Sequence, residues 1–189
     1  MKTVCVYCGS NVGVRDEYAE AARQLARHLA AAGVGIVYGG ASKGLMGILA
    51  DAMLEAGGEV VGVIPEALQA REIAHRSLTE LHVVNSMHER KALMAELSNA
   101  FVALPGGFGT LEEIVEMLTW AQLQIHEKPC ALLNVAGYFD GLLAYLDHAV
   151  AEGFLRPQHR RMLLVAGDAA ELMTCFEEYR APAVQKWLR

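Results

Sequence analysis

Short apolar runs alternate with longer amphipathic stretches along almost the whole chain. The apolar runs, whose length and β-branched content predict strands, cover residues 4–7, 35–38, 60–64, 82–84, 101–104, 130–134 and 162–165. The stretches between them predict helices over residues 16–32, 45–56, 87–97, 111–124, 139–152 and 169–179. Strands that are apolar throughout are typical of a parallel sheet covered on both faces. We predict an α/β fold, a single doubly wound (Rossmann-like) domain over residues 1–189 with a mainly parallel sheet of about seven strands and helices on both faces.

Composition supports one folded domain and argues against some classes of binding partner. With 189 residues, of which 53% are hydrophobic and 20% charged, the chain suits one substantial core. The net charge of −6 argues against binding nucleic acid by phosphate neutralisation. No apolar run is long enough for a membrane span, and no signal-peptide pattern follows Met1. We therefore expect a cytoplasmic protein with neither a nucleic-acid nor a membrane partner.

The cysteines and histidines do not form a metal-binding pattern. Cys5 and Cys8 have C-x-x-C spacing, but they lie in and beside a predicted buried strand, and Cys130 and Cys175 form no second pair. The seven histidines are scattered. We predict structural thiols and no metal site.

Three predicted strands end in small or glycine-rich turns, at residues 8–10, 39–44 and 105–110. In a parallel sheet these turns share the edge where ligands bind. Glycine lets a backbone approach a ligand closely, and a helix N-terminus favours an anion, so the turns predict a phosphate site. Neither longer turn matches the Walker or dinucleotide fingerprint. A plain strand-to-helix connection is the alternative, above all for residues 39–44.

Two basic residues follow a predicted helix start. Ser86 and Glu89 have capping-box spacing, which places Arg90 and Lys91 in the first turns of the helix. Cations there oppose the helix dipole, so a bound anion would explain them. The alternative is a pair of solvated surface cations.

Glu113 is the carboxylate nearest the glycine loop at residues 105–110. Thr110 and Glu113 also have capping-box spacing, and the same spacing recurs at Asp168 and Glu171. Position alone favours a capping role for Glu113 over a catalytic one. No G-x-S-x-G elbow is present, so acyl hydrolysis is not supported.

The motifs together resemble the LOG family. Residues 105–113 match its P-G-G-x-G-T-x-x-E signature, and residues 87–91 match its second signature. The resemblance covers about residues 4–165 in the same motif order. LOG proteins are cytokinin riboside 5'-monophosphate phosphoribohydrolases that were formerly labelled lysine decarboxylases. We reject the decarboxylase label because no lysine stands out as the imine-forming partner of pyridoxal phosphate.

The resemblance implies an enzyme of cytokinin biosynthesis that cleaves the N-glycosidic bond of AMP or N6-substituted adenosine 5'-monophosphates, without a cofactor. It implies catalytic roles for Arg90 and Glu113, and a homodimer with the site near the subunit boundary. Substrate contacts are expected at Gly39, Gly40, Glu72, Met87, Arg90, Lys91, Gly106, Gly107, Phe108, Gly109, Thr110, Glu113 and Thr119.

A carrier of nucleotides or phosphorylated cofactors with the same fold is the alternative function. In that case Glu113 would be only a helix cap. Residues 167–189 carry no recognised motif and are expected to form a closing helix with a tail.

Overall fold

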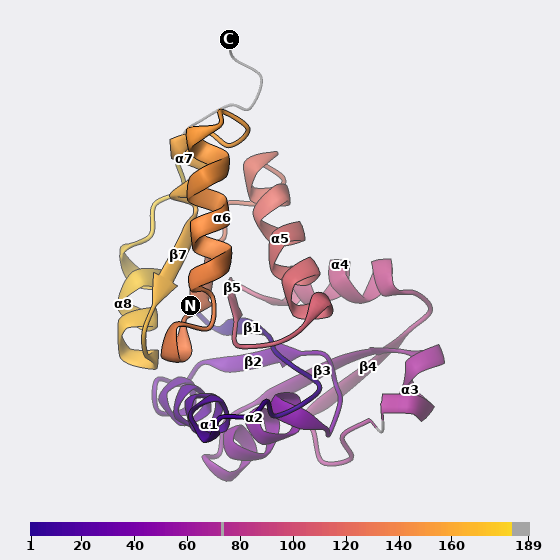
Figure 1. Ribbon diagram of the computed structural model, residues 1–189. Coiled ribbons are helices and arrows are strands. Elements are labelled where there is room, and N and C mark those ends of the chain that lie inside the picture. Colours follow the sequence, from indigo (N-terminus) through magenta and orange to yellow (C-terminus); the bar gives the residue numbers. More distant parts are fainter. Residues whose placement is uncertain (73, 183–189) are drawn as a thin grey trace.

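The computed structural model describes residues 1–72 and 74–182, apart from the side chains of residues 70–72. Its centre is one sheet of seven strands, all paired in parallel, in the order β4-β3-β2-β1-β5-β6-β7 (Figure 1). The strands are β1 (Thr3–Tyr7), β2 (Gly35–Tyr38), β3 (Val60–Pro65), β4 (Glu80–Val84), β5 (Ala100–Ala103), β6 (Cys130–Leu133) and β7 (Leu163–Ala166). The predicted α/β fold and its parallel sheet are confirmed.

Six helices lie where the amphipathic stretches predict them, within a few residues at each end. These are α1 (Asp16–Ala31), α2 (Gly44–Glu55), α4 (Met87–Leu97), α5 (Phe108–Gln122), α6 (Asp140–Ala151) and α8 (Ala169–Glu178). Three short elements were not predicted, namely α3 (Glu66–Glu72), α7 (Pro157–Arg160) and the 3-10 turn η1 (Val135–Gly137). They are too short to show a helical period in the sequence.

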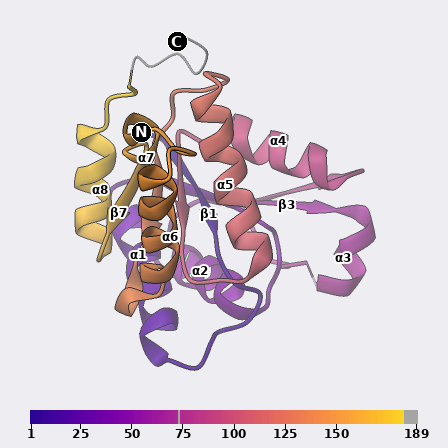
Figure 2. The same ribbon diagram turned by 45° about the horizontal axis from the view of Figure 1, so that its top comes forward.

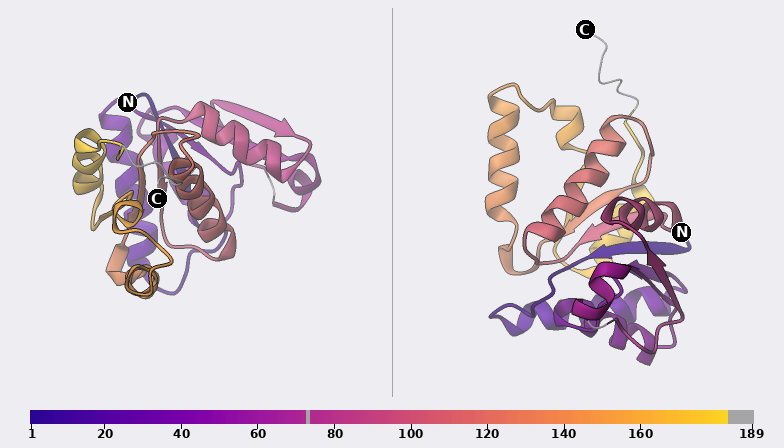
Figure 3. Two further views of the ribbon diagram at one scale, coloured as in Figure 1. Left: turned by 90° about the horizontal axis from the view of Figure 1, so that it is seen from above. Right: turned by 90° about the vertical axis from the view of Figure 1, so that its right-hand side faces the viewer.

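The sheet separates two apolar layers, because successive strand side chains point to opposite faces. In β1, Val4 and Val6 pack with α1, α2 and α8, whereas Cys5 and Tyr7 pack with α4 and α5. The side view in Figure 3 shows α1 and α2 on one side of the strands and α5 and α6 on the other. Helices on both faces explain why the central strands are apolar throughout, whereas the edge strand β4 is partly exposed.

The order in which strands are added to the sheet changes direction at the boundary between β1 and β5. Strands β1 to β4 run outward to one edge, and β5 to β7 run outward to the other, as the opposite positions of α3 and α8 in Figure 2 reflect. Gly9 N donates to Pro105 O at 3.0 Å, which joins the loops after β1 and β5. In open α/β sheets this switch point, at the carboxyl ends of the strands, is where ligands bind.

None of the helices among the described residues is both long enough and apolar enough to cross a membrane. The longest, α1, is amphipathic and buries one face through Tyr18, Ala22, Leu25, Ala26 and Leu29. Their spacing of three or four residues is that of a helix lying on a sheet.

Candidate active site

An arginine and a glutamate from neighbouring helices form a buried ion pair. Arg90 of α4 and Glu113 of α5 bring Nη1 and Oε1 to 3.3 Å from each other. Each residue is only 7% exposed. A buried charge is costly unless it is paired, and here each of the two charges has the other as its partner. The structure thus brings together the two residues predicted to be catalytic.

Backbone carbonyl groups near the ends of β2 and β3 fix the arginine from its other side. Arg90 donates from Nε to Val63 O at 3.1 Å and from Nη2 to Gly39 O at 3.5 Å. Met87 Sδ lies 4.0 Å from Arg90 Nη1. A Cβ atom on Gly39 would collide with Arg90 Nη2, so a glycine is required to admit the guanidinium. Sequence reasoning missed this role, because no spacing rule connects positions 39 and 90.

Lys91 faces α5 as well, but it binds a different pair of carboxylates. Its Nζ pairs with Glu112 Oε1 and, at 3.1 Å, with Glu116 Oε2. Burial alone lowers the pKa of Lys91, but the hydrogen bonds to Glu112 and Glu116 outweigh it and leave the pKa above its ordinary value. In this structure Lys91 therefore links α4 to α5 as a firmly protonated cation.

The helix that carries both cations begins as predicted. Ser86 Oγ accepts from Glu89 N at 3.1 Å, and Glu89 Oε2 accepts from Asn85 N at 2.9 Å, one residue earlier than a standard capping box. The interpretation of Arg90 and Lys91 as solvated surface cations is wrong, because both are buried. Carboxylates of α5 offset the positive charge at this helix start.

The glycine loop between β5 and α5 presents backbone N–H groups to solvent. Gly107 is the N-cap of α5 and makes no side-chain capping bond. The first N–H groups of a helix have no acceptor within it, which leaves those of Phe108, Gly109 and Thr110 available to an anion. The Phe108 side chain is 93% exposed. Five predicted substrate contacts, from Gly106 to Thr110, thus lie on one short segment.

The predicted capping box of Thr110 and Glu113 is wrong. Thr110 lies inside α5 and is buried, because the helix already begins at Phe108. A Cβ atom on Gly106 would collide with Thr110 Oγ1, so the tight approach of loop and helix requires a glycine there. The Glu113 carboxylate pairs with Arg90 of the neighbouring helix.

The same spacing does form a cap at α8. Asp168 Oδ1 accepts from Glu171 N at 2.9 Å, and Glu171 Oε2 accepts from Gly167 N at 2.6 Å. At α5 the two residues before Thr110 are already helical, so Thr110 cannot be the N-cap.

The end of β1 lies near Glu113 and offers no other ionised group. Burial raises the pKa of Cys5 to about 12, a hydrogen bond with Tyr7 opposes the rise, and the Glu113 charge adds to it. Burial also raises the pKa of Cys8, again with a contribution from Glu113. The four cysteines are free; Cys175 is partly exposed and the others are buried. Their interpretation as structural thiols agrees with this burial.

The second glycine turn, after β2, needs left-handed backbone conformations. Gly40 has φ +78° and Gly44 has φ +62°, values that side chains with a Cβ rarely adopt. His75 N donates to Gly40 O at 3.0 Å, which ties this turn to the segment after α3. Glu72 ends α3, but its side chain lies outside the described part of the chain. Its predicted contact with substrate stays a prediction.

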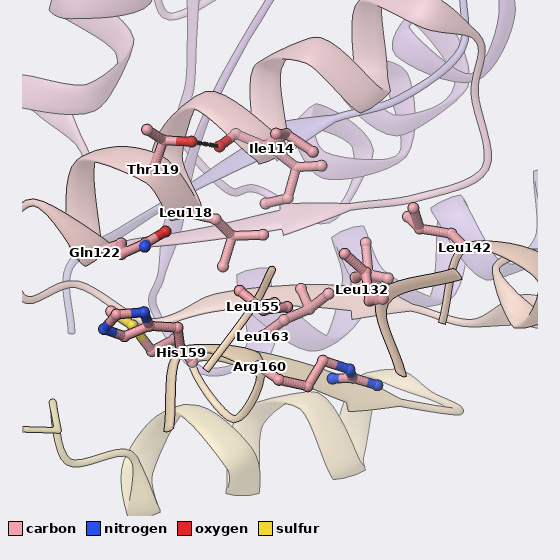
Figure 4. A pocket seen from close by; sticks show the side chains of 13 residues that line it. Ile114, Leu118, Thr119, Gln122, Leu132, Leu142, Leu155, His159, Arg160 and Leu163 are labelled. Carbon is pink, nitrogen blue, oxygen red and sulfur yellow. Dashed lines mark hydrogen bonds between the residues drawn. The ribbon is translucent and has the colours of Figure 1, made fainter. Parts of the chain in front are cut away.

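Thr119 does not join the Arg90–Glu113 pair in this chain. It lies six residues beyond Glu113 in α5, which places the two about 120° apart around the helix axis. The Thr119 hydroxyl donates to Val115 O at 2.8 Å and lines a groove of about 130 Å³ between α5 and α6 (Figure 4). Apolar side chains, including Leu118 and Leu142, line most of this groove.

The arrangement combines a carboxylate, a guanidinium and a row of peptide N–H groups at one sheet edge. Such a set suits a phosphate monoester and a reaction in which positive charge develops on the substrate. Among the described residues, no three His, Cys, Asp or Glu side chains are grouped so that they could hold a metal ion.

Comparison with known proteins places the chain in a family. A family described as "Possible lysine decarboxylase" matches residues 46–176. LOGL9 of Oryza sativa subsp. japonica, called a probable cytokinin riboside 5'-monophosphate phosphoribohydrolase, is 54% identical over 94% of this chain and 78% of its own length. The Arabidopsis thaliana enzyme LOG7, with the same activity in its name, is 50% identical over 94% of this chain and 82% of its own length. The chain belongs to the LOG family.

Solved structures resemble this LOG chain in fold alone. The molybdenum cofactor carrier protein of Chlamydomonas reinhardtii has a TM-score of 0.69 and 21% identity, and covers 94% of this chain and 96% of its own. The molybdenum cofactor binding protein of Rippkaea orientalis has a TM-score of 0.70 and 18% identity over the same shares. At such identity the shared architecture carries no statement about function.

Proposed function

We propose that this chain hydrolyses the N-glycosidic bond of AMP or N6-substituted adenosine 5'-monophosphates, which gives the free base and ribose 5-phosphate. The buried Arg90–Glu113 pair beside a glycine loop with free N–H groups is the observation that carries this proposal. The activity named for relatives with about half of their residues identical supports it.

The reaction breaks the bond between C1′ of the ribose and the base nitrogen. The bonding electrons leave with the base, and positive, oxocarbenium-like charge grows on the sugar. The ionised Glu113 carboxylate stabilises that charge and polarises the attacking water, whose oxygen binds C1′ while its proton is delivered to the base. Arg90 balances the charge of Glu113, and the N–H groups of Gly107, Gly109 and Thr110 hold the 5'-phosphate.

The lysine neighbouring Arg90 argues against a pyridoxal-dependent decarboxylase. An imine-forming lysine needs an accessible amine that loses its proton readily, which a lowered pKa provides. Lys91 is buried, pairs with Glu112 and Glu116, and has a raised pKa. It therefore has the opposite of the required properties.

Product analysis with one charge-removing variant tests the proposal. Purified protein is incubated with AMP and with its N6-isopentenyl derivative, and the products are separated by chromatography. Glu113→Gln keeps the side-chain shape but removes the charge, so we expect base release to fall by roughly 100-fold or more. Glu171→Gln is the matched control, because glutamine is accepted at its capping position, and its activity should equal that of the wild type.

Two further results separate the hydrolase from a carrier. Adenosine, which lacks the phosphate, should react poorly, because the N–H groups at the start of α5 would have no anion to bind. Wild-type protein that binds AMP but releases no adenine would contradict the hydrolase and favour the carrier.

We further infer that two copies associate through α5 and α6, so that Thr119 of each copy reaches the site of the other. Helix α6 has no buried residue, and Tyr145 on it is 66% exposed. The apolar groove beside α6 is open to a partner, and Thr119 faces outward there, away from its own Glu113. An exposed apolar surface of this kind is typical of a protein interface.

Mixed dimers test this inference. Glu113→Gln and Thr119→Val are mixed after unfolding and refolding together, and sedimentation reports the oligomeric state. If Thr119 acts across the interface, each mixed dimer contains one intact site and activity returns. Mixtures no more active than the separate variants, or a monomer in solution, would contradict the inference.

The cytoplasmic location and the absence of nucleic-acid and membrane partners stay predictions.

A further inference from the structure

A tyrosine from the connection between β6 and α6 reaches across to the glycine loop. Tyr138 follows η1 directly, and its hydroxyl donates to Gly106 O at 2.6 Å. Both residues line a cavity of about 250 Å³ at the switch point, together with the β1–α1 loop from Gly9 to Gly13. The hydroxyl thus acts on the loop from a third segment of the chain.

This hydrogen bond fixes the direction of the next N–H group. A peptide unit is planar and trans, so the carbonyl of Gly106 and the N–H of Gly107 point in opposite directions from the same plane. Because Tyr138 binds the carbonyl, the Gly107 N–H is held pointing away from the tyrosine. The preceding peptide is fixed in the same way, since Pro105 O accepts from Gly9 N at 3.0 Å.

The loop needs such a restraint because its own residues provide little. Gly107 is exposed, and a Cβ atom at this position would meet nothing within 4 Å. Glycine has more backbone freedom than any other residue, so an unrestrained loop would sample many orientations of its N–H groups. Among the described contacts of this loop, the Tyr138 hydroxyl is the restraint that comes from a side chain.

Tyr138 is itself firmly placed. Its ring packs edge to face against Tyr18 at 5.6 Å and against Phe139 at 5.0 Å between centroids. The preceding turn holds Ala136 at φ +51°, a left-handed conformation that costs a residue with a Cβ about 1 kcal/mol or more. The strained turn places the Tyr138 hydroxyl on the glycine loop, and strain that is retained at such a position indicates a functional role for the hydrogen bond.

We propose that Tyr138 is a positioning residue for the phosphate group of the substrate. Its hydroxyl orients the peptide N–H groups of the glycine loop before the nucleotide binds. The proposal rests on the proposed function for its substrate, but the orientation of the loop concerns binding and not the chemical step. Loss of the hydroxyl therefore weakens contacts made equally in the bound substrate and in the transition state, which raises KM and leaves kcat unchanged.

Tyr138→Phe removes the hydroxyl and keeps both aromatic contacts. We expect KM for AMP to rise roughly three- to tenfold, the effect of one lost hydrogen bond, with kcat within about twofold of the wild type. Tyr179→Phe, which changes the C-cap tyrosine of α8, is the matched control and should leave both constants unchanged.

Binding measured by calorimetry separates this proposal from the proposed function. The Kd for ribose 5-phosphate should rise by the same factor in Tyr138→Phe, while the Kd for adenine should stay the same. An unchanged Kd for ribose 5-phosphate, or an equal loss of affinity for adenine, would overturn the positioning role. Wild-type protein that releases no base defeats the hydrolase proposal, but the two Kd ratios still decide the role of Tyr138.

Discussion

Replacing Gly39 by alanine should reduce catalysis by displacing Arg90. The added Cβ would occupy the place of Arg90 Nη2 and would also approach Met46 Sδ to 3.1 Å. The backbone of Gly39 has no left-handed φ, so alanine itself fits there without strain. The guanidinium is the end of a flexible side chain and will move away from the new methyl group. Its contacts with Gly39 O and Glu113 are then lost.

The expected magnitude follows from that displacement. Overpacking in a rigid core costs about 1–3 kcal/mol, and a mobile side chain relieves part of it, but Glu113 loses its buried partner, so the unfolding free energy should fall by roughly 1–3 kcal/mol. A misplacement of about 1 Å at a catalytic group costs on the order of 100-fold in rate. We expect kcat/KM for AMP to fall by that factor in Gly39→Ala, measured by release of adenine.

The matched control is Gly167→Ala before α8, where a Cβ atom meets only Glu171 Oε2, at 3.4 Å. It should keep full activity, with an unfolding free energy within about 1 kcal/mol of the wild type. A folded Gly39→Ala variant with kcat/KM within twofold of the wild type would refute the role given to this glycine.

One further variant and one thiol reagent test the structure around the site. Lys91→Met should lower the unfolding free energy by about 1–3 kcal/mol in urea titrations, because Glu116 loses its buried partner. Since the pKa of Lys91 is raised, this contribution is complete at neutral pH and falls as the pH rises beyond about 10.4, so a contribution that stays constant over that alkaline range would contradict it. A thiol reagent should modify Cys175 first in the folded protein, and Cys5, Cys8 and Cys130 only on unfolding; fast reaction of more than one thiol would show that the strand ends are open.

The fold was predictable because its signals are local and repeated. Each strand reads as a short apolar run, and each longer helix shows its period over three or more turns. The order of the strands across the sheet then follows largely from the rules for βαβ units. Elements such as α7 (Pro157–Arg160) carry no such period, so they were missed.

The site was predictable in its residues but not in its contacts. The motifs place Arg90, Lys91 and Glu113 near one edge, yet only the structure shows that the two adjacent cations bind different carboxylates. Neighbours in a helix point about 100° apart, and the packing of α4 against α5 decides what each meets. The contacts of Gly39 with Arg90 and of Gly106 with Tyr138 join residues 51 and 32 positions apart, which no spacing rule detects.

The charge balance of the site makes one more prediction about how phosphate is held. Arg90 and Lys91 are paired with Glu113, Glu112 and Glu116, so these five side chains carry no net positive charge. Long-range attraction for a dianionic phosphate is therefore weak, and affinity must depend on the backbone N–H groups at the start of α5, which act over short distances. Salt screens long-range attraction far more than contact hydrogen bonds. We expect KM for AMP to rise less than about threefold when added salt increases from 0.05 to 0.3 M, whereas a rise of about tenfold or more would mean that unpaired cations, and not the glycine loop, hold the phosphate.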